Sequence, residues 1–262
     1  MIIDTHSHIF DEAFDADRQQ VIQRSIDADV CYQIMPNVDT STINALENTA
    51  HQYNCCFPLM RLHPTSVNND FEQQLNTIEQ KLASHKFYGI GEIGIDLYWD
   101  KTFVNQQIEA FRHQLQLAKK LQLPVSIHVR NAFNEAFNVI DSEIDSTLSG
   151  VFHCFAGTLQ QYQHIEAYKT FMIGIGGIVT YKNGGINKII TQINTSKILL
   201  ETDSPYLSPE PNRGKRNEPF NITYTAKTTA ALLNISVAEL STITTQNAIK
   251  LFKLPITQQK QN

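Results

Sequence analysis

The amino-acid sequence predicts a single α/β domain folded as a (β/α)8 barrel of the TIM type. Short runs of apolar and β-branched residues alternate with longer amphipathic segments from one end of the chain to the other. The apolar runs are nearly continuous, as is typical of strands buried on both faces of a parallel sheet. Eight such units in 262 residues suit one barrel. A doubly wound open sheet produces a similar alternation and is the alternative fold.

Each element is placed by its local pattern. We expect helices wherever apolar residues recur at steps of three and four, and the clearest case is 104–121, which Pro124 follows as a stop signal. No linker, low-complexity segment or further repeat divides the chain, so residues 1–262 are expected to form one domain. The strands are expected at 2–6, 30–36, 57–62, 87–95, 124–129, 150–154, 170–175 and 197–202. The other helices are expected at 18–27, 41–51, 71–84, 132–140, 159–168, 186–193, 222–233 and 237–252.

Composition narrows the class of protein. A hydrophobic fraction of 42% allows a sizeable core, and a net charge of −5 argues against a nucleic-acid binder that works by bulk charge alone. The N-terminus lacks a signal-peptide pattern, and no apolar run is long enough to span a bilayer. The four cysteines form no CxxC pair, so reduced thiols are expected. These features predict a cytoplasmic protein without a membrane partner; a monomer is compatible, but the oligomeric state stays open.

Six side chains with metal-binding chemistry stand at or near the ends of five predicted strands. The carboxyl ends of all barrel strands face one mouth, so these side chains are expected to converge there. His6 and His8 lie two residues apart on a strand and therefore point the same way. Each residue alone has a structural explanation, such as a hydrogen-bonded histidine or an aspartate cap, but their joint placement favours a metal centre. The six residues are His6, His8, Glu92, His128, His153 and Asp203.

Six ligands are too many for one tetrahedral ion. They suit two divalent ions about 3.5–4 Å apart with Glu92 as the bridge, the arrangement of two-metal hydrolases. Mixed imidazole and carboxylate ligands are compatible with Zn, Mn, Fe or Ni, and the carboxylates keep Mg possible. Asp203 is also the candidate general base, which would pass a proton towards the leaving group. We expect one ion on His6, His8 and Asp203 and the other on His128 and His153.

Other residues of the predicted mouth are candidates for binding substrate. His63 follows the third strand and either contacts substrate or stabilises a turn. Arg130 either forks on a phosphate or pairs with a neighbouring acid. Tyr98 and Trp99 either stack on a base or pack in the core. Glu201 faces inward with Asp203 and is expected to support a metal-bound histidine.

The segment 209–219 follows the eighth strand, and its proline and glycine content predicts a loop at the mouth. Arg213, Lys215 and Arg216 in this loop are expected to track a nucleic-acid backbone; an ordinary solvated surface is the alternative. The glycine-rich run 174–177 is expected to let the end of the seventh strand pass close to the metal site, rather than to bind phosphate.

Five motifs resemble those of the TatD-family metal-dependent hydrolases, which include deoxyribonucleases within the amidohydrolase superfamily. Their order and spacing match along nearly the whole chain. The resemblance implies a (β/α)-barrel, two metal ions on the six residues named above, and phosphodiester hydrolysis. The motifs are Asp4-Thr5-His6-Ser7-His8, Gly91-Glu92-Ile93-Gly94-Ile95-Asp96, His128-Val129-Arg130, His153-Cys154-Phe155-Ala156-Gly157 and Glu201-Thr202-Asp203-Ser204-Pro205.

The chain departs from the family pattern at three places. Arg61 stands where many members have glycine in the third-strand motif, and Leu97 separates Asp96 from Tyr98, where members often have tyrosine directly. Glu92 takes the position that a carboxylated lysine occupies in some superfamily relatives. The resemblance therefore implies the chemistry more firmly than the substrate.

Three hypotheses follow for function. The first is a metal-dependent deoxyribonuclease acting on DNA or another phosphodiester through a metal-activated water. The second is a hydrolase of a small molecule or of an aminoacyl-tRNA ester or amide bond, an activity linked to some related proteins. The third is a non-catalytic metal-binding regulatory protein. The complete ligand set argues against the third, and the basic loop favours the first over the second.

Overall fold

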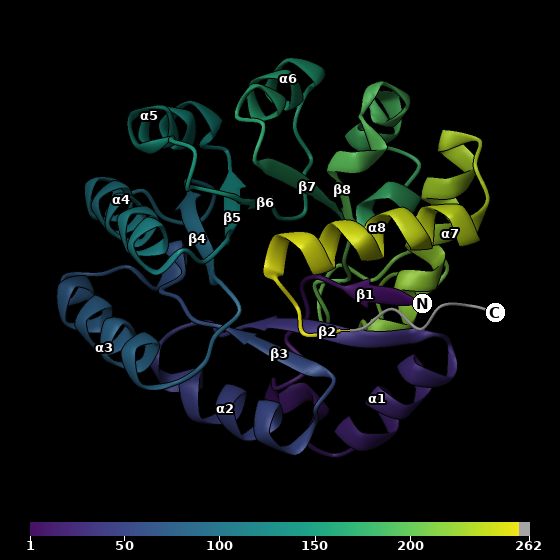
Figure 1. Cartoon of the computed structure of the whole chain (residues 1–262), viewed down its shortest axis with the longest axis horizontal. Helices are drawn as coiled ribbons and strands as arrows, with labels where there is room; N and C mark the ends of the chain where they lie inside the picture. The colour runs from purple at the N-terminus through teal and green to yellow at the C-terminus, as the bar shows by residue number, and fades with distance from the viewer. Residues whose placement is uncertain (257–262) are drawn as a thin grey trace.

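The computed structural model describes residues 1–256, and eight strands alternate with helices around a barrel (Figure 1). All neighbouring strands in each sheet pair in parallel. Parallel pairing follows from the helix that separates successive strands for most of the chain. The strands are β1 (Ile2–Asp4), β2 (Val30–Pro36), β3 (Cys56–Leu59), β4 (Ile90–Asp96), β5 (Val125–Arg130), β6 (Gly150–Phe152), β7 (Phe171–Ile175) and β8 (Ile198–Leu200).

The strands divide into two sheets that meet at two seams. One sheet has the order β1-β2-β3 and the other the order β4-β5-β6-β7-β8. At one seam the Gly91 N–H donates to the Met60 carbonyl at 3.3 Å, and at the other the Thr5 N–H donates to the Leu200 carbonyl at 3.0 Å. These bonds link the two sheets into a ring, which confirms the barrel and not the open sheet.

The helices surround this ring as predicted, with one exception. The predicted helix 186–193 is wrong: this stretch forms two short 3-10 turns, Gly185–Lys188 and Ile190–Gln192. Its isoleucines are β-branched and recur every three or four residues, so they bury one side of a 3-10 turn as readily as of an α-helix. The α-helices are α1 (Arg18–Asp27), α2 (Ile43–Gln52), α3 (Phe71–Ser84), α4 (Val104–Leu121), α5 (Phe133–Glu143), α6 (Leu159–Ala167), α7 (Ile222–Leu233) and α8 (Val237–Phe252).

Helix α8 closes the amino end of the barrel. Leu251 and Phe252 of this helix pack with strand residues such as Ile3, Ile34 and Leu199 in one buried cluster. Figure 1 shows α8 lying across the barrel in front of the strands. Apolar side chains therefore fill the amino half, and only the opposite end, at the carboxyl ends of the strands, is left for polar side chains to converge.

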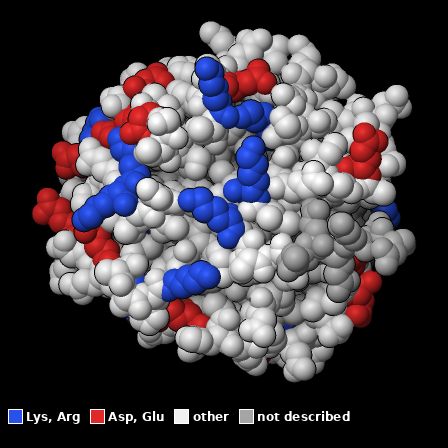
Figure 2. All heavy atoms as spheres, viewed as in Figure 1, with Lys and Arg blue, Asp and Glu red and all other residues white. Residues whose placement is uncertain are grey.

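Basic side chains gather on the face that α8 covers (Figure 2). Lys250 and Lys253 belong to α8 and the residue after it, and Lys197 directly precedes β8. Because α8 packs on the amino end of the barrel and Lys197 precedes a strand, this positive charge lies away from the strand carboxyl ends. Among the helices of the described part, none has the length and apolarity that crossing a membrane requires.

Candidate metal centre

Glu92 on β4 lies at the middle of the predicted ligand set. Its Oε2 is 3.2 Å from His6 Nε2, and its Oε1 is 2.7 Å from His128 Nδ1 and 3.7 Å from His153 Nε2. Burial raises the pKa of Glu92, but the charge of Arg61 and the neighbouring histidines outweigh it and hold the pKa well below its usual range. An ionised carboxylate whose two oxygens face different histidines has the geometry of a bridging ligand.

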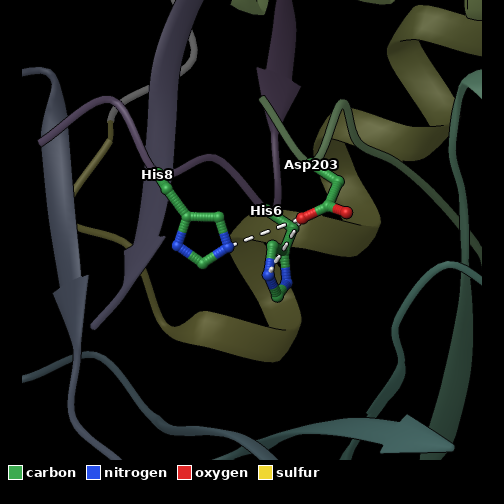
Figure 3. A group of neighbouring side chains, drawn as sticks. All are labelled: His6, His8 and Asp203. Atoms are coloured by element: carbon green, nitrogen blue, oxygen red, sulfur yellow. Dashed lines mark ion pairs between the residues drawn. The ribbon is translucent and has the colours of Figure 1, made fainter. Parts of the chain in front are cut away.

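His6, His8 and Asp203 form the first group of converging ligand atoms (Figure 3). Asp203 Oδ1 lies 3.5 Å from His8 Nε2 and 3.9 Å from His6 Nε2. His8 Nδ1 is 3.0 Å from the Pro36 carbonyl oxygen, which can only accept a hydrogen bond. The proton of neutral His8 is therefore on Nδ1, and the Nε2 lone pair is free for an ion.

His6 is fully buried, and neither of its ring nitrogens has a hydrogen-bond partner in the described structure. Burial lowers its pKa to about 3, with a further lowering by the charge of His153, whose ring stacks on it at a centroid distance of 3.5 Å. Buried polar atoms without partners are rare because they lose hydration without compensation. A neutral imidazole in this state fits a divalent ion as its missing partner.

His128 and His153 approach Glu92 from β5 and from the residue after β6. His128 Nε2 is 2.9 Å from Asp96 Oδ2. Burial lowers the pKa of His128, yet hydrogen bonds to Asp96 and Glu92 raise it overall. The sequence motif that contains Asp96 did not predict a role for it. Its position on the same strand as Glu92, four residues further on, is the feature that could have indicated one.

Glu201, which the sequence predicted to support a metal-bound histidine, lies beside His153. Its Oε1 accepts a hydrogen bond from the backbone N–H of Cys154 and lies 3.0 Å from His153 Nδ1, although that pair is not aligned as a hydrogen bond. Burial lowers the pKa of His153, but the charges of Glu201 and Glu92 raise it to about 10. A Cβ atom on Gly174 would lie 2.1 Å from Glu201 Oε2, so glycine here makes room for the carboxylate.

His63 lies beside the centre with its proton directed inward. Its Nδ1 accepts a hydrogen bond from the Thr65 N–H at 3.2 Å, so in the neutral ring the proton is on Nε2. That nitrogen is 3.5 Å from Glu92 Oε1. Burial and the charge of Arg61 lower the pKa of His63 to about 4, which keeps the ring neutral. His63 is thus arranged as a hydrogen-bond donor, and it also caps the turn that follows, as the turn-stabilising alternative expected.

Arg61 is a second residue of this site to which the sequence assigned no role. Its side chain is 1% exposed, and its Nη2 lies 3.0 Å from Glu92 Oε2. Burial lowers its pKa to about 10, against the opposite effect of Glu92, so the guanidinium stays charged at neutral pH. In the sequence, the departure from glycine in the third-strand motif is the feature that points to Arg61.

The aromatic pair after β4 is on the surface, not in the core. Trp99 is 72% exposed and Tyr98 is 52% exposed. The Arg130 guanidinium lies over the Tyr98 ring at 3.7 Å and over the Trp99 ring at 5.3 Å. Since β4 and β5 are neighbours, this Tyr98–Trp99–Arg130 platform adjoins the strand that carries His128.

The three basic residues of the loop after β8 differ in their contacts. Arg216 bonds Asp17 Oδ2 at 2.7 Å and Glu218 Oε1 at 2.9 Å, which favours a structural role that ties the loop to the start of α1 over a phosphate contact. Arg213 is exposed and lies over the Tyr181 ring at 4.4 Å. Lys215 is exposed as well.

The barrel, the candidate ligands at its mouth and the comparisons with known proteins assign the chain to the metal-dependent hydrolases. The model of the family "TatD related DNase" matches residues 3–253, and the chain belongs to this TatD family. It is 35% identical over 256 residues to the uncharacterized metal-dependent hydrolase YabD of Bacillus subtilis, covering 97% of this chain and 100% of that protein. YcfH of Escherichia coli, described in the same words, is 30% identical over 194 residues, 74% of this chain and 72% of YcfH.

The solved structures agree with this assignment. The crystal structure of YJJV, a TatD homolog from Escherichia coli, matches with a TM-score of 0.88 and 27% identity over 97% of this chain and 98% of that one. A TatD-family hydrolase from Entamoeba histolytica matches with a TM-score of 0.80 at 21% identity, which supports the fold.

Proposed function

We propose that this protein hydrolyses phosphodiester bonds of DNA with two divalent metal ions held by His6, His8, Glu92, His128, His153 and Asp203. The observation that carries the proposal is the position of Glu92, whose Oε2 faces His6 and whose Oε1 faces His128. Zn, Mn, Mg and Ni are all compatible with this donor set. The family model's own description supports a nucleic-acid substrate.

The residues of the centre would divide the chemistry among them. Bound divalent ions supply a lowered pKa for water and positive charge for the phosphoryl group. Asp203 would accept the proton of the attacking water, because its carboxylate is 15% exposed at the mouth whereas that of Glu92 is 6% exposed. Asp203 is also ionised, since the neighbouring histidines hold its pKa low against burial, which raises it. His63 would donate a hydrogen bond from its Nε2–H to Glu92 or to a substrate oxygen.

Substrate recognition would use the exposed groups around this centre. The Tyr98–Trp99–Arg130 platform offers an aromatic face to a base and a guanidinium to a phosphate. Arg213 and Lys215 would follow the nucleic-acid backbone, while Arg216 would hold their loop in place through Asp17. The free thiols of the four cysteines fit a reducing compartment, so we propose that the protein acts in the cytoplasm.

The test is hydrolysis by metal-reconstituted protein. Purified protein is stripped of metal and supplied with Mg, Mn or Zn, then incubated with labelled single-stranded DNA, an aminoacyl-tRNA and a simple carboxylic ester. Cleavage of DNA with at least one metal is expected. Cleavage of the ester substrates alone would replace the nuclease by an esterase or deacylase, and metal binding without any turnover would favour the regulatory alternative.

A further inference from the structure

The candidate metal centre contains an arginine, Arg61, whose guanidinium carries a permanent positive charge. Arg61 is almost fully buried, and its guanidinium contacts Glu92, the carboxylate that lies among the candidate ligand histidines. Its Nη2 approaches Glu92 Oε2, the oxygen that also faces His6 Nε2 at 3.2 Å. A carboxylate oxygen has two lone pairs and can accept an N–H while binding an ion. Arg61 therefore need not displace an ion, but its charge reduces the attraction of Glu92 for one.

The surrounding chain holds Arg61 in this position. The Asn37 side chain accepts from the Arg61 N–H at 2.7 Å and donates to the Arg61 carbonyl at 3.0 Å. Arg61 Nη1 donates to the Val38 carbonyl at 3.3 Å. The backbone is fixed from both sides and the side chain from its far end. Within the described structure, Glu92 is the acidic side chain that Arg61 reaches within ion-pair distance.

We propose that Arg61 is a positioning residue that separates the two metal-binding steps, so that the centre holds its first divalent ion firmly and its second one weakly. The inference rests on the proposed two-ion centre. The second ion must share Glu92 with both the first ion and the guanidinium, and its site fills only at high metal concentration.

Two effects of removing Arg61 oppose each other. Loss of an outer hydrogen bond to a ligand weakens metal binding by about 10–100-fold. Repulsion between a guanidinium and a divalent ion that share one carboxylate, at an effective dielectric constant of about 20, amounts to several times the thermal energy and corresponds to a larger factor. Removal of the charge is therefore expected to strengthen binding of the second ion, a direction that damage to the fold would not produce.

The test measures binding and not activity. Metal-free wild type, Arg61→Met and Arg61→Lys are titrated with Zn or Mn by calorimetry, and bound metal is counted after equilibrium dialysis. Methionine removes the charge at similar length, and lysine keeps it. Arg112→Met on α4, which removes an exposed arginine that pairs with Glu143, is the control for a general change of charge.

We expect Arg61→Met to bind its second ion at least tenfold more tightly than wild type, and the lysine and control variants to resemble wild type. Two equally tight ions in wild type, or a methionine variant whose second ion is no tighter or absent, would overturn the inference. If Arg61→Met does not fold, Arg61→Gly carries the residue that many family members have there. The binding isotherms are independent of DNA cleavage, so failure of the nuclease proposal and failure of this one are distinguishable.

Discussion

Glu201 Oε1 lies 3.0 Å from His153 Nδ1, and Gly174 on the neighbouring strand leaves the space that the carboxylate occupies. If the charge of this carboxylate supports the imidazole as a metal ligand, Glu201→Gln should lower metal affinity by about 10–100-fold. Gly174→Ala should produce a similar loss, since its Cβ would collide with Glu201 Oε2. The matched control is Gly185→Ala, where a new Cβ would lie 4.0 Å from the Ala156 carbonyl oxygen. Equal affinity of wild type and Gly174→Ala in equilibrium dialysis would contradict this role.

Asp203→Asn should separate metal binding from proton transfer. Asparagine keeps an oxygen that can face the ion but cannot take up a proton at neutral pH. We expect kcat to fall by about 100-fold or more, with metal still bound. Single-turnover cleavage and metal analysis on the same samples measure both quantities. A fully active variant would show that another group accepts the proton.

The Tyr98–Trp99–Arg130 platform should bind a nucleobase. Trp99→Ala is expected to raise KM for single-stranded DNA by about 5–100-fold while kcat changes little, because stacking is worth about 1–3 kcal/mol per base. Leu121→Ala, which shortens an exposed apolar side chain at the end of α4, is the control. An unchanged KM for Trp99→Ala would exclude stacking on this residue.

The basic residues of the loop after β8 should have two different roles, DNA binding and stabilisation of the fold. Arg213→Ala and Lys215→Ala are each expected to reduce the slope of log binding constant against log salt by about 0.7 for single-stranded DNA. Arg216→Ala should instead lower the free energy of unfolding by about 1 kcal/mol, because its exposed fraction is 30% and its two carboxylate partners lose their cation. Salt-dependent binding curves and urea unfolding distinguish the two roles. The same change of salt slope in all three variants would contradict the division.

Glu143 should make the free energy of unfolding depend on pH. Burial raises its pKa, but hydrogen bonds from Lys119, Gln116 and Arg112 of α4 outweigh it, so its folded pKa lies below the ordinary value of 4.5. A lowered folded pKa contributes stability that is present above the unfolded pKa and is lost as pH falls through the folded pKa. Glu143→Gln should thus cost about 1 kcal/mol at pH 7 and nothing at low pH. Thermal unfolding in the metal-free state at several pH values measures this difference.

The sequence alone determined the barrel and the set of candidate metal ligands. Both depend on local patterns: apolar runs mark buried strands, and a polar residue at a strand's carboxyl end points to the mouth wherever the neighbouring strands lie. The one failed element, 186–193, is a stretch whose apolar spacing suits two kinds of helical turn equally well.

Only the tertiary structure decided which partners these residues meet. Arg61 reaches Glu92, 31 positions away, and Glu201 meets His153 across the sheet. Arg216 pairs with Asp17, 199 positions away, and this pairing favours a structural role over the predicted contact with phosphate. Spacing along the chain carries no information on such pairs, because the distance between two side chains from different strands is set by packing of the whole barrel. The candidate ligands could therefore be predicted from the sequence, and the charged side chains that surround them could not.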